Sequence, residues 1–383
     1  MKLVMAATMI WAAAFVAGAA QRPAPFAGLL DQHPAIDYRG GALSDAVSML
    51  QRDINAGAKS IAFEGQQGYL RSVLAALSVP VESQVLVFSK TGLQHPFTSP
   101  ENPRALYFND RVVVGYIPGA PVLEMAAHDP SQGVIFQTLK QDAASAQFAR
   151  PDRCLGCHRS ANSMSVPGIL VRSMSTAPDG RPMPQEGSFV IDHRSQLEQR
   201  WAGWFVTGAA PTVTHLGKPI DPRVNLSAYP VPTSDVAALL TFDHQGHAIN
   251  LLTRLGWETR LAAAEGRLNV TTGDLGDILK EAVDYFLFVD ETPLASPVQG
   301  TSAFASAFAA SGPRDRKGRS LRDLDLQTRL LKYRFSYMVY SPAFDALPPA
   351  ARTAFFTRAR TVLQSRGDSA VMEILDDTRP GWR

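Results

Sequence analysis

The stretch that decides the fold covers residues 104–139 and reads RALYFNDRVVVGYIPGAPVLEMAAHDPSQGVIFQTL. It contains short runs rich in β-branched and aromatic residues, separated by Asn109-Asp110, Pro118-Gly119 and Asp129-Pro130. These dipeptides are typical of tight turns, and they recur at hairpin spacing. The stretch therefore predicts an antiparallel meander, in which consecutive strands pair.

The sequence on either side of this stretch extends the pattern. Before it, apolar residues at helical spacing predict helices at 42–54 and 70–77, and 84–88 predicts a strand. After it, an irregular stretch at 160–187 is followed by predicted strands at 188–191 and 204–207. Further helices are predicted at 236–260, 274–288, part of 321–340, and 350–365. The order predicts an α+β fold with a β-rich N-terminal half, an irregular centre and a helical C-terminal half, because no βαβαβ alternation is present.

We divide the chain into four predicted regions. They are a signal peptide at 1–20, a β-rich region with N-terminal helices at 21–145, a c-type haem-binding region at 146–232 and a mainly helical region at 233–383.

The predicted haem-binding region rests on the run Cys154-Leu155-Gly156-Cys157-His158, which holds both cysteines of the chain. A C-x-x-C-H run is typical of covalent attachment of a c-type haem. Two thiols at this spacing can bond the two vinyl groups of a porphyrin, and the histidine that follows can bind the iron as proximal ligand. The expected cofactor is one covalent haem c, held by Cys154, Cys157 and His158.

Two other readings of the same run are open. A C-x-x-C pair can also be a redox dithiol or disulfide, or half of a zinc site. A zinc site closed by protein ligands needs a fourth ligand, and the chain has no further cysteine. A thioredoxin-like dithiol usually follows a strand, whereas Phe148-Ala149-Arg150-Pro151-Asp152-Arg153 precedes this run. Both observations favour haem.

The first twenty residues predict export. Lys2 precedes an apolar stretch at 3–16, and Ala17-Gly18-Ala19-Ala20 forms a small-residue cleavage site. The apolar stretch is short for a membrane span, which needs about 20 residues, so we expect no stable membrane span after the signal is removed. The similarity of the C-x-x-C-H run to that of c-type cytochromes implies that haem is attached outside the bacterial cytoplasm, so a periplasmic or secreted protein is expected.

Composition and charge indicate which kinds of partner to expect. The chain has 45% hydrophobic and 19% charged residues, as expected for an ordinary globular protein, and its formal net charge is only +2. No long basic run is present, so the sequence gives no reason to expect a nucleic-acid partner. A redox partner protein is the expected partner.

The sixth iron ligand is left open by the sequence. His193 is the leading candidate because the carboxylate of Asp192 beside it could orient the ring. His244 and His215 are alternatives, and the remaining candidates are His247, Met164, Met174 and Met183. A methionine would raise the reduction potential, a second histidine would lower it, and an open position would let small ligands bind. Arg194 and Arg200 are candidate partners of the haem propionates.

Six short runs carry a resemblance to a known group of proteins. They are NPRALYFND (102–110), VGYIPG (114–119), CLGCH (154–158), RWAGWFVTG (200–208), FDHQ (242–245) and SYMVYS (336–341). Together they resemble bacterial exported proteins described as cytochrome c domain-containing, over roughly residues 83–348. The resemblance implies covalent haem at Cys154 and Cys157, iron on His158, and electron transfer.

The leading functional hypothesis is an exported single-haem c-type cytochrome that transfers electrons. The alternatives are a haem enzyme of peroxidase type, with a distal set drawn from His193, Arg194 and Glu198, or a haem-based sensor with an open sixth position. Against the first alternative, dihaem bacterial peroxidases carry two C-x-x-C-H runs and this chain has one.

Overall fold

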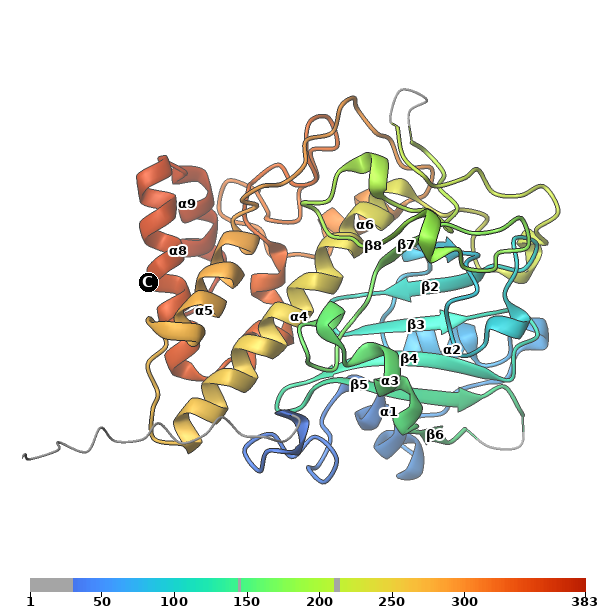
Figure 1. The fold of residues 1–383 in the computed structure, drawn as a ribbon, viewed down its shortest axis with the longest axis horizontal. Helices are drawn as coiled ribbons and strands as arrows, with labels where there is room; N and C mark the ends of the chain where they lie inside the picture. Colours follow the sequence, from blue (N-terminus) through green and yellow to red (C-terminus); the bar gives the residue numbers. More distant parts are fainter. Residues whose placement is uncertain (1–29, 144–145, 210–213) are drawn as a thin grey trace, which may run out of the picture.

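The computed structural model describes residues 30–143, 146–209 and 214–383. The predicted signal peptide at 1–20 lies outside these residues. Figure 1 shows the sheet in one half of the molecule and a group of helices in the other half. The α+β class, with strands in the N-terminal half and helices in the C-terminal half, is confirmed.

The central element is an antiparallel sheet whose spatial order, among the described residues, is β1-β2-β3-β4-β5-β6. The strands are β1 (Val85–Val87), β2 (Arg104–Phe108), β3 (Val112–Tyr116), β4 (Val122–Asp129), β5 (Gly133–Lys140) and β6 (Phe148–Ala149). Each strand pairs with the next in the chain, and the turn dipeptides predict the pairings from β2 to β5. The sheet is therefore the predicted meander. A separate pair, β7 (Arg172–Met174) and β8 (Ser188–Val190), forms a small hairpin.

The two faces of the sheet pack against different parts of the chain. One face packs on the two N-terminal helices, α1 (Ala46–Asn55) and α2 (Leu70–Ala76), through side chains such as Tyr107 and Val114. The other face belongs to the larger core and includes a row of cross-strand neighbours, Phe108, Val113, Ala126 and Phe136. Side chains alternate between faces along a strand, so the odd and even positions of one strand build two separate cores.

Helix α4 (Val236–Ala264) runs through the larger core. It begins at Asp235, whose carboxylate accepts hydrogen bonds from the backbone N–H groups of Ala237 and Ala238. Nearly all of its residues are buried, including polar ones such as Asp243 and His244. A helix that is buried on all sides is the centre of a domain rather than a surface element. The expected helix at 236–260 is thus confirmed, and it lies at the heart of the fold.

The remaining helices surround α4. They are α3 (Leu155–His158), α5 (Gly273–Phe286), α6 (Phe304–Ala310), α7 (Pro342–Asp345), α8 (Pro349–Arg366) and α9 (Ser369–Thr378). In Figure 1, α5, α8 and α9 stand together on the side of α4 that faces away from the sheet, whereas α3 lies in front of the sheet. Phe286 of α5 and Phe355 of α8 meet edge to face, with ring centroids 5.2 Å apart, so this group shares one apolar core.

One predicted helix is largely absent. In 321–340 the structure has only a 3-10 turn at Tyr337–Tyr340, and the rest is irregular. Asp325 accepts hydrogen bonds from the backbone N–H groups of Gln327 and Thr328 and so stabilises a turn instead. Such side-chain-to-backbone bonds compete with helix formation.

In the part of the chain that the structure describes, no helix combines the length and the apolar character needed to cross a bilayer.

Candidate functional site

The C-x-x-C-H run forms one compact helical turn. A 3-10 turn at Asp152–Cys154 leads into α3, and the backbone of Cys154 already has helical dihedral angles. Residues three apart on a helix lie on the same face, so the side chains of Cys154 and Cys157 are neighbours. Both thiols are free; that of Cys154 is half-buried and that of Cys157 is exposed. Leu155 is buried and anchors the turn in the larger core.

The imidazole of His158 is oriented by the chain that follows it. Its Nδ1 lies 2.9 Å from the carbonyl oxygen of Gly168. A carbonyl can only accept, so Nδ1 carries the hydrogen and Nε2 keeps a free lone pair. The ring also packs on Phe136, with centroids 4.6 Å apart. Burial lowers the pKa of His158, so the neutral ring, which is the form that binds a metal, is favoured.

The loop after His158 is closed by its own polar groups. The hydroxyl oxygen of Ser163 lies 3.0 Å from the carbonyl oxygen of His158 and 2.8 Å from that of Val166. The N–H of Gly168 donates to the carbonyl of His158 at 2.9 Å. These contacts hold the two ends of the loop together. The carbonyl of Gly168 is therefore kept close to the His158 ring that it orients.

Two side chains of α4 dock the same loop: Arg254 donates to the carbonyl of Met164 at 2.9 Å, and Asn250 bonds Ile169. Asn250 accepts a hydrogen bond from the N–H of Ile169 and donates one to its carbonyl, both at 2.8 Å. A Cβ atom on Gly168 would lie 2.3 Å from Oδ1 of Asn250, which is much closer than van der Waals contact. Glycine at 168 is therefore needed for the close approach of the loop to the helix.

An ion pair on the sheet lies beside the C-x-x-C-H turn. Arg104 of β2 and Glu124 of β4 are joined at 3.2 Å across the glycine of β3, Gly115. Burial raises the pKa of the Cys154 thiol, and the negative charge of Glu124 raises it further. The Nε atom of Arg104 is buried without a partner. A half-buried cation with an unused donor, close to the cysteines, is suited to an anionic group such as a propionate.

These features fit a covalently held haem. The turn offers two free thiols on one face, and the next residue offers a neutral imidazole whose Nε2 is free. Among the described residues, no three His, Cys, Asp or Glu side chains come together as a group that could hold a metal ion. A haem requires no such group, since the porphyrin supplies four of the iron ligands.

His193, the leading sequence candidate for the sixth ligand, lies in a buried pair with His244. Their Nδ1 atoms are 2.8 Å apart, and Nε2 of His244 lies 2.7 Å from the hydroxyl oxygen of Ser336. The ring of His193 stacks on Phe288 with centroids 4.6 Å apart. Nε2 of His193 is buried without a partner, so it is the one ring nitrogen of the pair left for a ligand. The contacts described for the pair are with α4, α5 and the 336–337 segment rather than with α3.

The other candidates for the sixth position are scattered. His215 is half-buried and meets the ring of Trp201 edge to face, with centroids 5.2 Å apart. His247 lies nearer the surface beside the carboxylates of Asp192 and Glu281. The methionines differ in setting: Met174 is buried in β7, Met183 is half-buried, and Met164 ends a 3-10 turn with a left-handed backbone at φ 60°.

The two arginines proposed for the propionates have other partners. Arg200 is buried, donates to the carbonyl of His193 at 2.8 Å and lies 3.4 Å from the carboxylate of Asp243. Burial raises the pKa of Asp243 to about 7, although Arg200 opposes the shift. Arg194 pairs with Asp192 at 2.6 Å. Both guanidinium groups are therefore engaged within the protein.

The residues of the peroxidase-type hypothesis do not form a joint set. His193 binds His244 through Nδ1, Arg194 is paired with Asp192, and Glu198 is exposed on a 3-10 turn. A general acid or base must lie within hydrogen-bond reach of the group that it serves. No contact among these three side chains is described.

Several residues of the site are absent from the sequence-based prediction. They are Phe136, Gly168 and Asn250, with the ion pair of Arg104 and Glu124. No local signal marks them, because each acts through a contact with another segment of the chain, from 10 residues away for Gly168 and His158 to 81 for Asn250 and Ile169. Comparison with models of protein families, with curated proteins and with solved structures finds no match to this chain.

Proposed function

We propose that this protein is an exported c-type cytochrome that carries one covalent haem and transfers electrons. Cys154 and Cys157 would form the thioether bonds, and His158 would be the proximal ligand. The observation that carries the proposal is the 2.9 Å hydrogen bond between Nδ1 of His158 and the carbonyl of Gly168. When bound, haem supplies an iron centre that accepts and releases one electron.

This hydrogen bond supports the proposal because histidines that bind metals usually donate their other N–H to a carbonyl or carboxylate. That bond fixes the tautomer and the ring orientation, and it makes the ligating nitrogen more basic. Asn250 and Ser163 hold the accepting loop in place, so the orientation of the ring is built into the fold.

The exposure of Cys157 supports electron transfer in particular. Its thiol lies at the surface, whereas the thiol of Cys154 is half-buried. A porphyrin bonded through both would have one edge directed toward solvent, where a redox partner protein could approach. The N-terminal sequence supports export to the compartment where haem is attached.

The first experiment tests attachment. The full-length chain is expressed with the bacterial machinery for c-type haem attachment, and exported material is examined by intact mass spectrometry and by its absorption in alkaline pyridine. We expect the mass of the processed chain plus one haem. A Cys154→Ser, Cys157→Ser double variant should lack the covalent haem, and a Ser160→Ala variant in the same loop should keep it. The bare polypeptide mass with both thiols unmodified would refute the proposal.

The second experiment separates electron transfer from ligand chemistry. We expect a low-spin reduced spectrum that does not shift when carbon monoxide is added, as for iron held by two strong protein ligands. A high-spin ferric spectrum that shifts with cyanide would contradict electron transfer as the main role. If His193 is the sixth ligand, His193→Ala converts the low-spin spectrum to high spin; an unchanged spectrum removes His193.

A further inference from the structure

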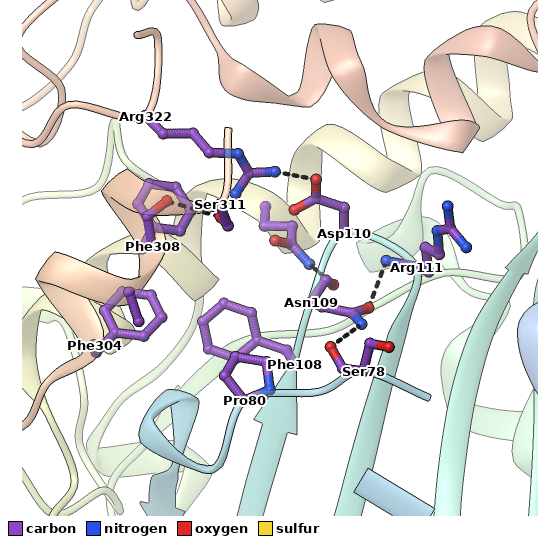
Figure 2. A pocket seen from close by; sticks show the side chains of 12 residues that line it. Ser78, Pro80, Phe108, Asn109, Asp110, Arg111, Phe304, Phe308, Ser311 and Arg322 are labelled. Carbon is purple, nitrogen blue, oxygen red and sulfur yellow. Dashed lines mark hydrogen bonds and ion pairs between the residues drawn. The ribbon is translucent and has the colours of Figure 1, made fainter. Parts of the chain in front are cut away.

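A cavity of about 310 Å³ lies away from the C-x-x-C-H turn. It is bordered by the β2–β3 turn, by α6, by Gln245 of α4 and by Arg322 (Figure 2). This volume is at the lower end of the range for small-molecule sites, about 300–1,000 Å³. No residue of this cavity takes part in the function proposed above.

One wall of the cavity is aromatic. Phe108 at the end of β2 and the α6 residues Phe304 and Phe308 follow one another, with ring centroids 5.8 Å and 5.5 Å apart. Figure 2 shows their rings grouped on one side of the cavity. A continuous wall of rings favours a flat aromatic ligand, which can stack or meet the rings edge to face.

The other wall carries a buried cation. Arg322 is only 6% exposed, and its guanidinium lies over the rings of Phe308 and Tyr337, at 4.8 Å and 4.7 Å from their centroids. With its faces covered, the group can form hydrogen bonds only at its edge. One edge nitrogen, Nη2, pairs with the carboxylate of Asp110, whereas Nε is buried without a partner. Buried donors normally have acceptors, so this arginine, which lines the cavity, keeps one unused donor.

The charges around the cavity favour an anion. Arg322 and Asp110 neutralise each other, and the exposed Arg111 adds one positive charge. The polar floor is rigid, because Gln245 donates to the carbonyl of Asn109 at 2.7 Å and accepts from the hydroxyl of Tyr337 at 3.1 Å. The site is therefore preformed, with a flat apolar side and, beside it, a guanidinium that is paired with Asp110 and keeps one donor without a partner.

We propose that this cavity binds a small planar aromatic molecule that carries one carboxylate group, with the ring against Phe108, Phe304 and Phe308 and the carboxylate directed at Arg322. The site is independent of the haem proposal, since it shares no residue with the C-x-x-C-H turn or its supporting loop.

The test uses the purified full chain and two probes, 2-naphthoate and its neutral analogue 2-naphthamide, with binding measured by titration calorimetry. Ala307 lines the cavity from an exposed position on α6, so Ala307→Trp should fill the cavity without disturbing the core. Ala310→Trp, at an exposed position of the same helix that does not line the cavity, is the matched control.

We expect the unmodified chain to bind naphthoate at least fivefold more tightly than naphthamide. Ala307→Trp should weaken naphthoate binding at least tenfold, and Ala310→Trp should leave it unchanged. Arg322→Gln, which leaves the sequence of α6 unchanged, should abolish the preference for the anion and serves as a second test should Ala307→Trp not fold. Absence of naphthoate binding, equal affinity for the two probes, or equal binding by Ala307→Trp and the unmodified chain would overturn the proposal.

Discussion

Replacing Gly168 with alanine should weaken the connection between the His158 loop and α4. The added Cβ would lie 2.3 Å from Oδ1 and 2.8 Å from Cγ of Asn250. That oxygen accepts the N–H of Ile169, and the amide nitrogen of the same side chain donates to the carbonyl of Ile169. The side chain is buried and engaged at both ends, so it cannot move away from the methyl group without breaking at least one of these bonds.

The cost follows from the groups left without partners. A buried N–H that loses its acceptor costs about 1–3 kcal/mol, and a weakened second hydrogen bond adds about 0.5–1.5 kcal/mol. Gly168→Ala should therefore lower the free energy of unfolding by about 1.5–4.5 kcal/mol. Because the carbonyl of Gly168 also accepts from Nδ1 of His158, the same substitution should disturb the orientation of that ring.

Urea unfolding followed by far-UV circular dichroism measures the effect. Gly156→Ala is the matched control: a Cβ there meets nothing within 4 Å, and the residue lies in α3. Alanine is favoured over glycine in a helix by up to about 1 kcal/mol, so the control should be neutral or slightly more stable. A Gly168→Ala variant within about 0.5 kcal/mol of the unmodified chain would refute the reasoning.

Two further predictions concern titratable groups. Burial lowers the pKa of His128 to about 4, so the unfolded chain binds this proton below about pH 6.5 and the folded chain does not until about pH 4. Stability should fall as the pH drops through that window, by up to roughly 3 kcal/mol from this residue. The free energy of unfolding is measured with urea at pH 7 and at pH 4. His128→Leu should lose less of this free energy between the two pH values than the unmodified chain, and an equal loss in both proteins would contradict the assignment. The second prediction is that Glu124→Gln lowers the pKa of Cys154, because burial and the Glu124 charge together raise it. Alkylation rates measured against pH in haem-free Cys157→Ser protein should then shift to lower pH, and an unshifted profile would count against this influence.

The meander was predictable because its signals are local. Each turn dipeptide lies between two runs of strand-forming residues, and the chain reverses there without help from elsewhere. The failed helix at 321–340 shows the limit of such reasoning. Its apolar spacing is compatible with a helix, but Asp325 bonds nearby backbone N–H groups and holds a turn.

The histidines show the same limit. The sequence places Asp192 beside His193 and so suggests that this carboxylate orients the His193 ring. In the structure Asp192 forms an ion pair with Arg194, and the His193 ring instead contacts His244. Neighbours in sequence need not point toward one another, and residues 51 apart do so here.

The sequence by itself determined the order of strands β2 to β5, the α+β class and the thiol–imidazole turn, since each depends on residues within a few positions of one another. Only the tertiary structure decided which side chains surround that turn and where the cavity beside Arg322 lies. Asn250 reaches Ile169 across 81 positions, and Arg322 reaches Asp110 across 212. Such pairs form because packing of the core brings distant segments within hydrogen-bond distance, and no short stretch of sequence encodes that proximity.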